Sequence, residues 1–178
     1  MIAISIPKER SAILIGKEGG IKALIEKRAD VKISVFDGDV SISGDPEKEA
    51  RVEEIVKAIG RGFPPEIALN LLSEDRVLDV ITIKGTSNTI KRLAARIIGT
   101  QGKARKNIEK LTGASVAVYG KTVSIIGSYK ESEKARTAIE MLIMGRRHSF
   151  VWTYLERVKF GELKAKFSKT EIQNESIE

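Results

Sequence analysis

Two stretches of four residues, each bounded by glycines, are the part of this 178-residue chain best suited to bind a ligand. They are Gly16–Gly19 and Gly99–Gly102, and each precedes a segment with helical spacing. Glycine has no Cβ and adopts positive φ readily, so its backbone can approach a sugar-phosphate strand closely. The N–H groups that open the following helix can then face a phosphate at the positive end of that helix. The pattern is compatible with non-covalent binding of a phosphate backbone, and the alternative is that the glycines serve only the geometry of the turn.

The two stretches belong to a longer internal repeat. Residue 99 follows residue 16 by 83 positions, and the flanks agree at the same offset: Ile25–Lys27 matches Ile108–Lys110, and Val40–Ile42 matches Val123–Ile125. An 83-residue period is too long for a solenoid and suits one small globular domain. The chain therefore predicts two similar domains and a tail.

Hydrophobic periodicity predicts the order β-α-α-β-β-α in each copy. The first copy is expected to have a strand at 2–6, helices at 8–15 and 20–29, a hairpin at 31–42 and a helix capped by Asp45. The second is expected to have a strand near Val80, helices at 90–98 and 103–112, a hairpin at 116–125 and a helix at 135–144. We expect domains at 1–62 and 76–147, a helical connector at 63–75, and a C-terminal helix and polar tail at 148–178, disordered from about Ser168.

Composition narrows the class of protein. A net charge of +7 and a pI of about 9.6 favour a polyanionic partner. The chain has no Cys, no basic leader and no apolar run of membrane-spanning length, so we expect a cytoplasmic protein without a membrane partner. With one His and no set of Ser, His and carboxylate at recognisable spacing, we expect no catalytic residues, no metal site, no cofactor and no enzyme activity.

The two copies differ in charge around their glycines. Residues 16–38 hold five basic and four acidic side chains, whereas residues 99–121 hold five basic ones and a single acid, Glu109. The hairpin turn is Asp37-Gly38-Asp39 in the first copy and Gly120-Lys121 in the second. Because phosphate is repelled by carboxylates, we expect the second copy to be the main nucleic-acid binder and the first a weaker binder or a protein contact.

A Gly-x-x-Gly loop between two helices, followed by a hairpin and a third helix, resembles the type I KH domain. The resemblance implies an α+β fold of two tandem KH domains, each a three-stranded antiparallel sheet packed on three helices. It also implies that the loop clamps the backbone of unpaired nucleotides, while bases lie on aliphatic residues such as Ile98, Ile108 and Val116. Core packing is the alternative role for each of these three residues. The predicted RNA-binding residues are Ile98, Gly99, Thr100, Gln101, Gly102, Lys103, Arg105, Lys106, Val116 and Lys121 in the second copy, and Gly16, Lys17, Glu18, Gly19 and Lys22 in the first.

The pairing of the two copies is similar to the Pno or Dim type of ribosome-assembly factor. The residues that carry this resemblance are Arg96–Gly99, Ile125–Ser128 and Ala135–Ile139. It implies binding near the 3′ end of small-subunit rRNA in the pre-ribosome, together with the endonuclease that matures that end. The eukaryotic members have a degenerate first loop, whereas Gly16 and Gly19 are intact here. Two alternatives use the same folds: a general single-stranded RNA or DNA regulator, and a protein-interaction scaffold.

Overall fold

The computed structural model describes the backbone of residues 1–175 and the side chains of residues 1–166. Two units with the same order of elements follow one another. The first unit contains β1 (Ile2–Ser5), α1 (Lys8–Ile15), α2 (Gly20–Ala29), β2 (Lys32–Phe36), β3 (Asp39–Ser43) and α3 (Pro46–Gly60). The second contains β4 (Val77–Thr82), α5 (Ser87–Ile98), α6 (Lys103–Thr112), β5 (Ser115–Tyr119), β6 (Thr122–Gly127) and α7 (Tyr129–Ile143). The predicted α+β class and the element order are confirmed.

Each unit has one three-stranded antiparallel sheet, in the orders β1-β3-β2 and β4-β6-β5. Strand alternation turns one face of each sheet toward the helices of its unit. In β3, Val40 and Ile42 are fully buried, whereas Ser41 and Ser43 point to the opposite face. The helices complete the core on the inner face with side chains such as Ile55.

Capping residues explain where the structure departs from the predicted helix starts. Asp45 caps α3 as expected, its carboxylate accepting the Glu47 N–H at 3.1 Å. Helix α7, however, begins at Tyr129, several residues earlier than predicted, because Ser128 and Glu131 form a capping box. Helix α5 likewise begins early, after the cap Thr86. It has 12 residues against 8 in α1, which separates β4 farther from its glycine loop.

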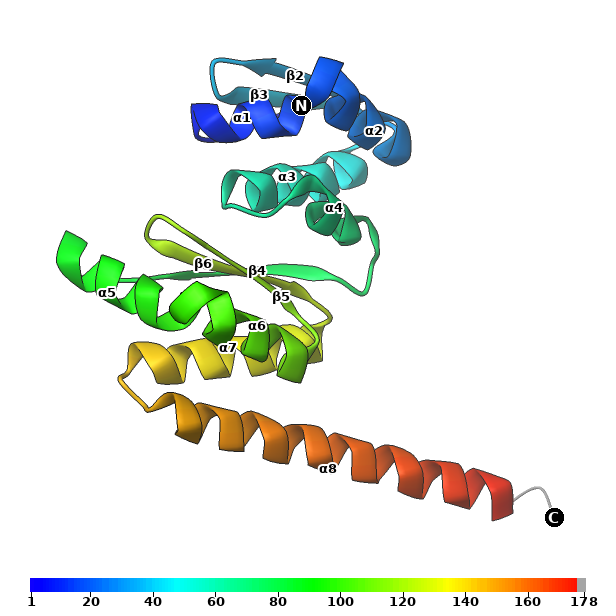
Figure 1. The fold of residues 1–178 in the computed structure, drawn as a ribbon. Coiled ribbons are helices and arrows are strands. Elements are labelled where there is room, and N and C mark those ends of the chain that lie inside the picture. Colours follow the sequence, from blue (N-terminus) through cyan, green and yellow to red (C-terminus); the bar gives the residue numbers. More distant parts are fainter. Residues whose placement is uncertain (176–178) are drawn as a thin grey trace.

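The connector packs between the two units. It forms α4 (Pro65–Ala68) and a 3-10 turn (Leu69–Leu72) in the segment where a helical connector was expected. Ala68 and Leu71 share one buried cluster with Ala117 and Ile126, which lie on the outer face of the second sheet. Figure 1 shows the result: the helices of the first unit lie on the sheet of the second, and both units face the same way.

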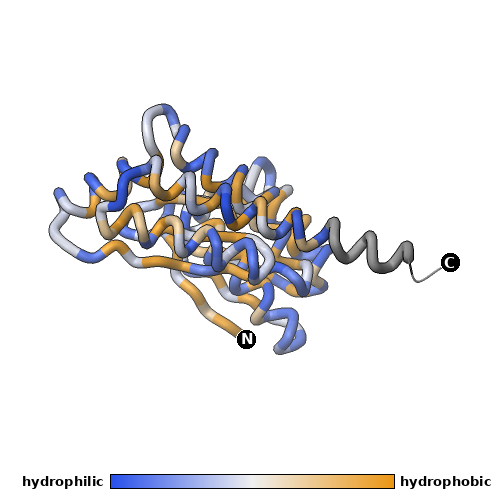
Figure 2. The backbone as a smooth tube through the Cα atoms, turned by 90° about the horizontal axis from the view of Figure 1, so that it is seen from below, coloured by the Kyte–Doolittle hydropathy of each residue, from blue (hydrophilic) through white to orange (hydrophobic). Residues whose placement is uncertain are grey.

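The last helix, α8 (His148–Glu175), lies beneath α7 in Figure 1. Its buried residues Val151 and Leu155 join the core of the second unit. Figure 2, which views this side, shows hydrophobic and hydrophilic residues alternating along the helix. The prediction of disorder from about Ser168 was wrong for the described residues, because the backbone is helical to Glu175; residues 176–178 lie outside them.

The β5–β6 turn also contacts the first unit. The Tyr119 hydroxyl donates a hydrogen bond to the Glu9 carboxylate, and the Arg10 guanidinium lies 6.0 Å from the centroid of the Tyr119 ring. The bond from Tyr119 is the main reason that the pKa of Glu9 lies below its usual value. The same bond raises the pKa of Tyr119, because it favours the protonated phenol.

Leu71→Ala should test the packing between the units. Leu71 is 2% exposed, and its truncation leaves a cavity that should lower the free energy of unfolding by about 2–5 kcal/mol. Leu163→Ala on α8 is the control, because Leu163 is 45% exposed and should cost less than about 0.5 kcal/mol. Equilibrium denaturation in guanidinium chloride measures both. Equal losses of stability in the two variants would contradict the burial of Leu71 between the units.

Tyr119→Phe should raise the pKa of Glu9 toward its ordinary value. The lowered pKa in the folded state stabilises the fold above the unfolded-state pKa, and this contribution is lost as the pH falls through the folded-state pKa. The free energy of unfolding of the variant should therefore change less with pH in the acid range than that of the wild type. Titration of the Glu9 carboxyl carbon by NMR measures the shift, and an unchanged pKa would show that the hydrogen bond is absent in solution.

Candidate nucleic-acid interface

The two glycine loops share one backbone conformation. In the second loop, φ is 72° at Gly99, 54° at Gln101 and 74° at Gly102. The corresponding residues of the first loop have φ values of 72°, 53° and 78°. These values lie in the left-handed region that favours glycine. The positive φ predicted for the glycines of both loops is confirmed.

The two glycines of each loop have different surroundings. A Cβ at Gly99 would lie 2.6 Å from the Cβ of Ala104, and one at Gly16 would lie 2.4 Å from Cγ1 of Ile21. A Cβ at Gly102 or Gly19 would meet nothing within 4 Å. The first glycine therefore lets the next helix pack against the loop. The second leaves the outer side of the loop open to an approaching backbone.

Helix α6 begins directly behind the second loop. Its N-cap is Gly102, and no side chain caps the helix N-terminus. The first turn contains no acidic side chain, so the positive end of the helix dipole is not neutralised locally. A phosphate beside Gly102 would meet this end of the helix.

Basic side chains surround the second loop. Lys103 and Lys106 are exposed on the first turns of α6, whereas Lys121, exposed at the β5–β6 turn, lines a hollow against β1 and α3 of the first unit. Arg105 is half-buried and donates to the Val116 carbonyl at 3.2 Å. Glu109, the only acid of this stretch, accepts the Val116 N–H at 2.8 Å and so braces α6 against β5. Thr100 and Gln101 are exposed at the tip of the loop.

The first loop is closer to neutral. Lys17 and Glu18 are both exposed at its tip, where their charges oppose each other. Lys22 forms an ion pair with Glu26 at 3.1 Å, and Glu26 also accepts the Ile33 N–H at 2.7 Å. Burial raises the pKa of Glu26, but these two hydrogen bonds outweigh it and hold the pKa below its usual value. Lys22 is therefore partly neutralised.

The aliphatic residues predicted to support bases require a correction. Val116 is 1% exposed and Ile108 is fully buried, and both belong to the core of the second unit. Val116 on β5 and Ile108 on α6 both point into this core, so neither side chain is on the surface where a base could lie. Ile98 is half-buried at the end of α5, and Val118 is half-buried on the same strand as Val116. Burial at single β positions could not be read from the alternating pattern alone.

A hollow beside the second loop was missed by the sequence analysis. It has a volume of about 830 Å³ and lies where α5, the loop and the start of α8 meet. Its cationic lining comes from Arg92, Arg96 and Lys103, and α8 adds His148 and Trp152, whose ring centroids are 5.7 Å apart. His148 and Trp152 reach the loop only because α8 folds back along the second unit.

Two features are absent from the described part of the chain. None of its helices combines the length and the apolar character needed to cross a membrane. No group of three or more His, Asp or Glu residues there could hold a metal ion.

In the second unit, the glycine loop between two helices, the three-stranded sheet and the third helix define a KH-type nucleic-acid-binding domain. Comparison with known proteins agrees with this class. The PNO1-type model of the eukaryotic type KH-domain (KH-domain type I) matches residues 74–160.

Three relatives narrow the family. The KH domain-containing protein MJ0443 of Methanocaldococcus jannaschii is 45% identical over 173 residues, covering 92% of this chain and 76% of the relative. The a/eIF2alpha-aDim2p-rRNA complex from Pyrococcus horikoshii contains a chain that superposes with a TM-score of 0.83 at 44% identity, covering 90% of this chain and 94% of that one. The pre-rRNA-processing protein PNO1 of Phaeosphaeria nodorum is 33% identical over 122 residues, which span 65% of this chain and 45% of PNO1. The chain belongs to the KH-domain RNA-binding family that includes PNO1 and archaeal Dim2p. This family is not a known enzyme family.

Gly99→Ala should destabilise the fold more than Gly102→Ala. Both substitutions force alanine into positive φ, at a cost of about 1–3 kcal/mol, but only the first drives a Cβ into Ala104. We expect a melting temperature for Gly99→Ala several degrees below that of Gly102→Ala, measured by circular dichroism. A lower melting temperature for Gly102→Ala would contradict the roles given to the two glycines.

Proposed function

We propose that the chain binds a single strand of RNA through both Gly-x-x-Gly loops, as two tandem type I KH domains. In this proposal the domains occupy 1–62 and 76–147, the connector 63–75, and the C-terminal helix and tail 148–178. The shared conformation of the two loops carries the proposal, because the second glycine of each is open on its outer side and precedes an uncapped helix. A phosphate can approach such a loop closely enough to reach backbone N–H groups.

The second loop should supply most of the binding energy. Lys103 and Lys106 are exposed beside it on α6, whereas Lys22 beside the first loop is held by Glu26. Each phosphate that an exposed cation neutralises adds to affinity through counterion release. Thr100 and Gln101 add neutral polar contacts where the first loop has the opposed charges of Lys17 and Glu18.

The RNA that we propose is the 3′-end region of small-subunit rRNA during ribosome assembly. Two relatives support this choice: the Pyrococcus complex contains rRNA, and the fungal PNO1 is named for pre-rRNA processing. A protein at that end would act in the pre-ribosome beside the endonuclease that matures the end, so we propose both as partners. The a/eIF2alpha of the Pyrococcus complex is a further candidate partner.

Gly102→Asp should weaken RNA binding much more than Gly19→Asp. Both positions have positive φ and open space, so the two variants are matched in backbone strain. A carboxylate at Gly102 would stand where the phosphate binds and should cost about tenfold to a hundredfold in affinity, the value of a hydrogen bond to a charged group. Gly19→Asp should cost only a few-fold.

Fluorescence anisotropy with a labelled RNA of the small-subunit rRNA 3′ end measures these affinities, and a scrambled RNA of equal composition is the control. A preference for the authentic RNA that Gly102→Asp abolishes would support the ribosome-assembly function. Equal affinity for both RNAs would indicate a general single-strand binder. Equal losses in the two variants would refute the unequal roles of the loops.

A further inference from the structure

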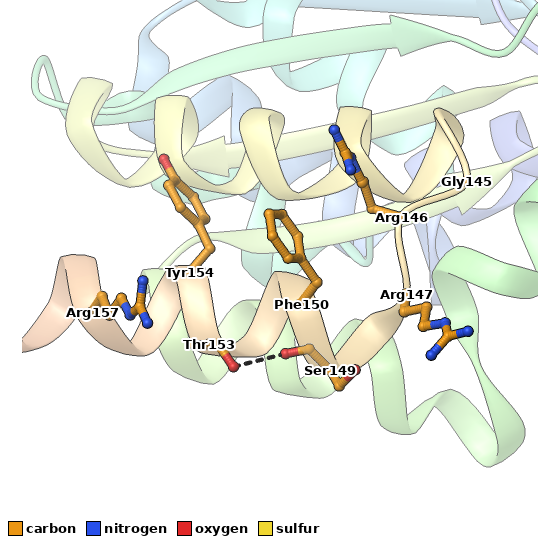
Figure 3. Close-up of a pocket in the computed structure, with 8 residues that line it drawn as sticks. All are labelled: Gly145, Arg146, Arg147, Ser149, Phe150, Thr153, Tyr154 and Arg157. Carbon is orange, nitrogen blue, oxygen red and sulfur yellow. Dashed lines mark hydrogen bonds between the residues drawn. The ribbon is translucent and has the colours of Figure 1, made fainter.

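The corner between α7 and α8 contains a second hollow, of about 640 Å³. Helix α7 ends at Ile143, Gly145 reverses the chain at a φ of 90°, and α8 starts at His148. Figure 3 shows Phe150 and Tyr154 extending from α8 toward α7, with Arg146 beside the Phe150 ring. The full lining is Gly145, Arg146, Arg147, Ser149, Phe150, Thr153, Tyr154 and Arg157.

The three arginines of this hollow are exposed and have no carboxylate partner among the described residues. No acidic side chain lines the hollow. A third hollow on α8 is different, because Glu131 and Glu162 line it together with its lysines, and Glu162 pairs with Lys134 at 2.9 Å. Unpaired guanidinium groups at a concave surface create a positive potential that attracts phosphate.

Phe150 adds an exposed aromatic face to the same surface. Its side chain is 51% exposed, and the Arg146 guanidinium lies 5.4 Å from its ring centroid. Because Val151 and Leu155 already attach α8 to the core, Phe150 is not needed for that packing. An aromatic ring next to a guanidinium is a suitable surface for an unpaired base and its phosphate.

Arg96 connects this corner to the second glycine loop. From α5, its side chain donates to the carbonyl of Leu142 at 3.2 Å and to that of Arg146. Its own carbonyl is 2.9 Å from Nε2 of His148. Arg96 and His148 also line the hollow of about 830 Å³ beside Gly99. The corner is therefore fixed to the helix that ends at the loop, and basic side chains continue from one hollow to the other.

We propose that the α7–α8 corner binds nucleotides of the same RNA strand that the second loop holds. The strand would pass the hollow at Arg92, Arg96, His148 and Trp152, and a further base would stack on Phe150 while Arg146, Arg147 and Arg157 contact phosphates. This proposal rests on the proposed function, since it extends the RNA path from Gly99–Gly102. It makes α8 part of the RNA-binding surface as well as a structural support.

The double variant Arg146→Ala/Phe150→Ala tests the proposal with RNAs of two lengths. A tetranucleotide fills one KH groove, whereas an RNA of about 12 nucleotides can also reach the corner. We expect the variant to lose about tenfold or more in affinity for the longer RNA, as removal of one stacked base and one phosphate contact predicts. Its affinity for the tetranucleotide should not change. The slope of log affinity against log salt for the longer RNA should fall by about 0.7.

The matched control is Tyr129→Ala/Lys130→Ala at the other end of α7. It also removes one exposed aromatic ring and one exposed cation, but at a distance from both hollows along the helix. This control should bind both RNAs like the wild type, and circular dichroism should show an unchanged fold for both double variants.

Gly102→Asp separates this proposal from the proposed function. If Gly102→Asp leaves binding of both RNAs unchanged, the proposed function itself fails. If Gly102→Asp weakens both RNAs but Arg146→Ala/Phe150→Ala weakens neither, only the corner proposal is overturned. It is also overturned if the corner variant weakens the tetranucleotide as much as the longer RNA, or if the control loses as much as the corner variant.

Discussion

The structure depends on burial of the outer face of the second sheet. A three-stranded sheet with helices on one side leaves its other side to water unless another element covers it. Here Ala117 and Ile126 turn to that other side and pack with Ala68 and Leu71 of the connector. The resulting core spans both units, so the first unit does not move freely on a linker. The relative position of the two glycine loops is therefore set by hydrophobic packing.

Sterics and electrostatics explain different features of the two glycine loops. Gly16 and Gly99 are required by packing, since a Cβ at either would collide with the next helix. Gly19 and Gly102 have open space, so packing does not explain the absence of a side chain there. The loops have nearly the same backbone conformation, and charge distinguishes them. Glu26 and Glu109 each accept a strand N–H, but only Glu26 also pairs with a lysine of its own helix, Lys22.

The repeat and its periodicity predicted the element order, the positive φ of the glycines and the cap at Asp45, because these properties are local. Whether Val116 faces the core or the surface could not be decided from the sequence, and the helix to Glu175 was not predicted, because each depends on the fold around it. The two hollows at the start of α8 were also missed. Arg96 and His148 are 52 positions apart and meet only after α8 folds back along the second unit. One signal was available: Arg146 and Arg147 stand beside an aromatic segment with no acid until Glu156.

The outer face of the first sheet carries hydroxyl groups where the second carries aliphatic side chains. Ser34 and Ser43 hold the repeat positions of Ala117 and Ile126, and both serines are exposed. Head-to-tail packing leaves a different unpaired surface at each end, and a further unit could add there unless that end is polar or covered. The serines make one end polar, and α8 covers the other by packing on α7, the counterpart of α3. The two end surfaces thus differ from the packed middle of the molecule, as the terminal repeats of a solenoid differ from its internal repeats.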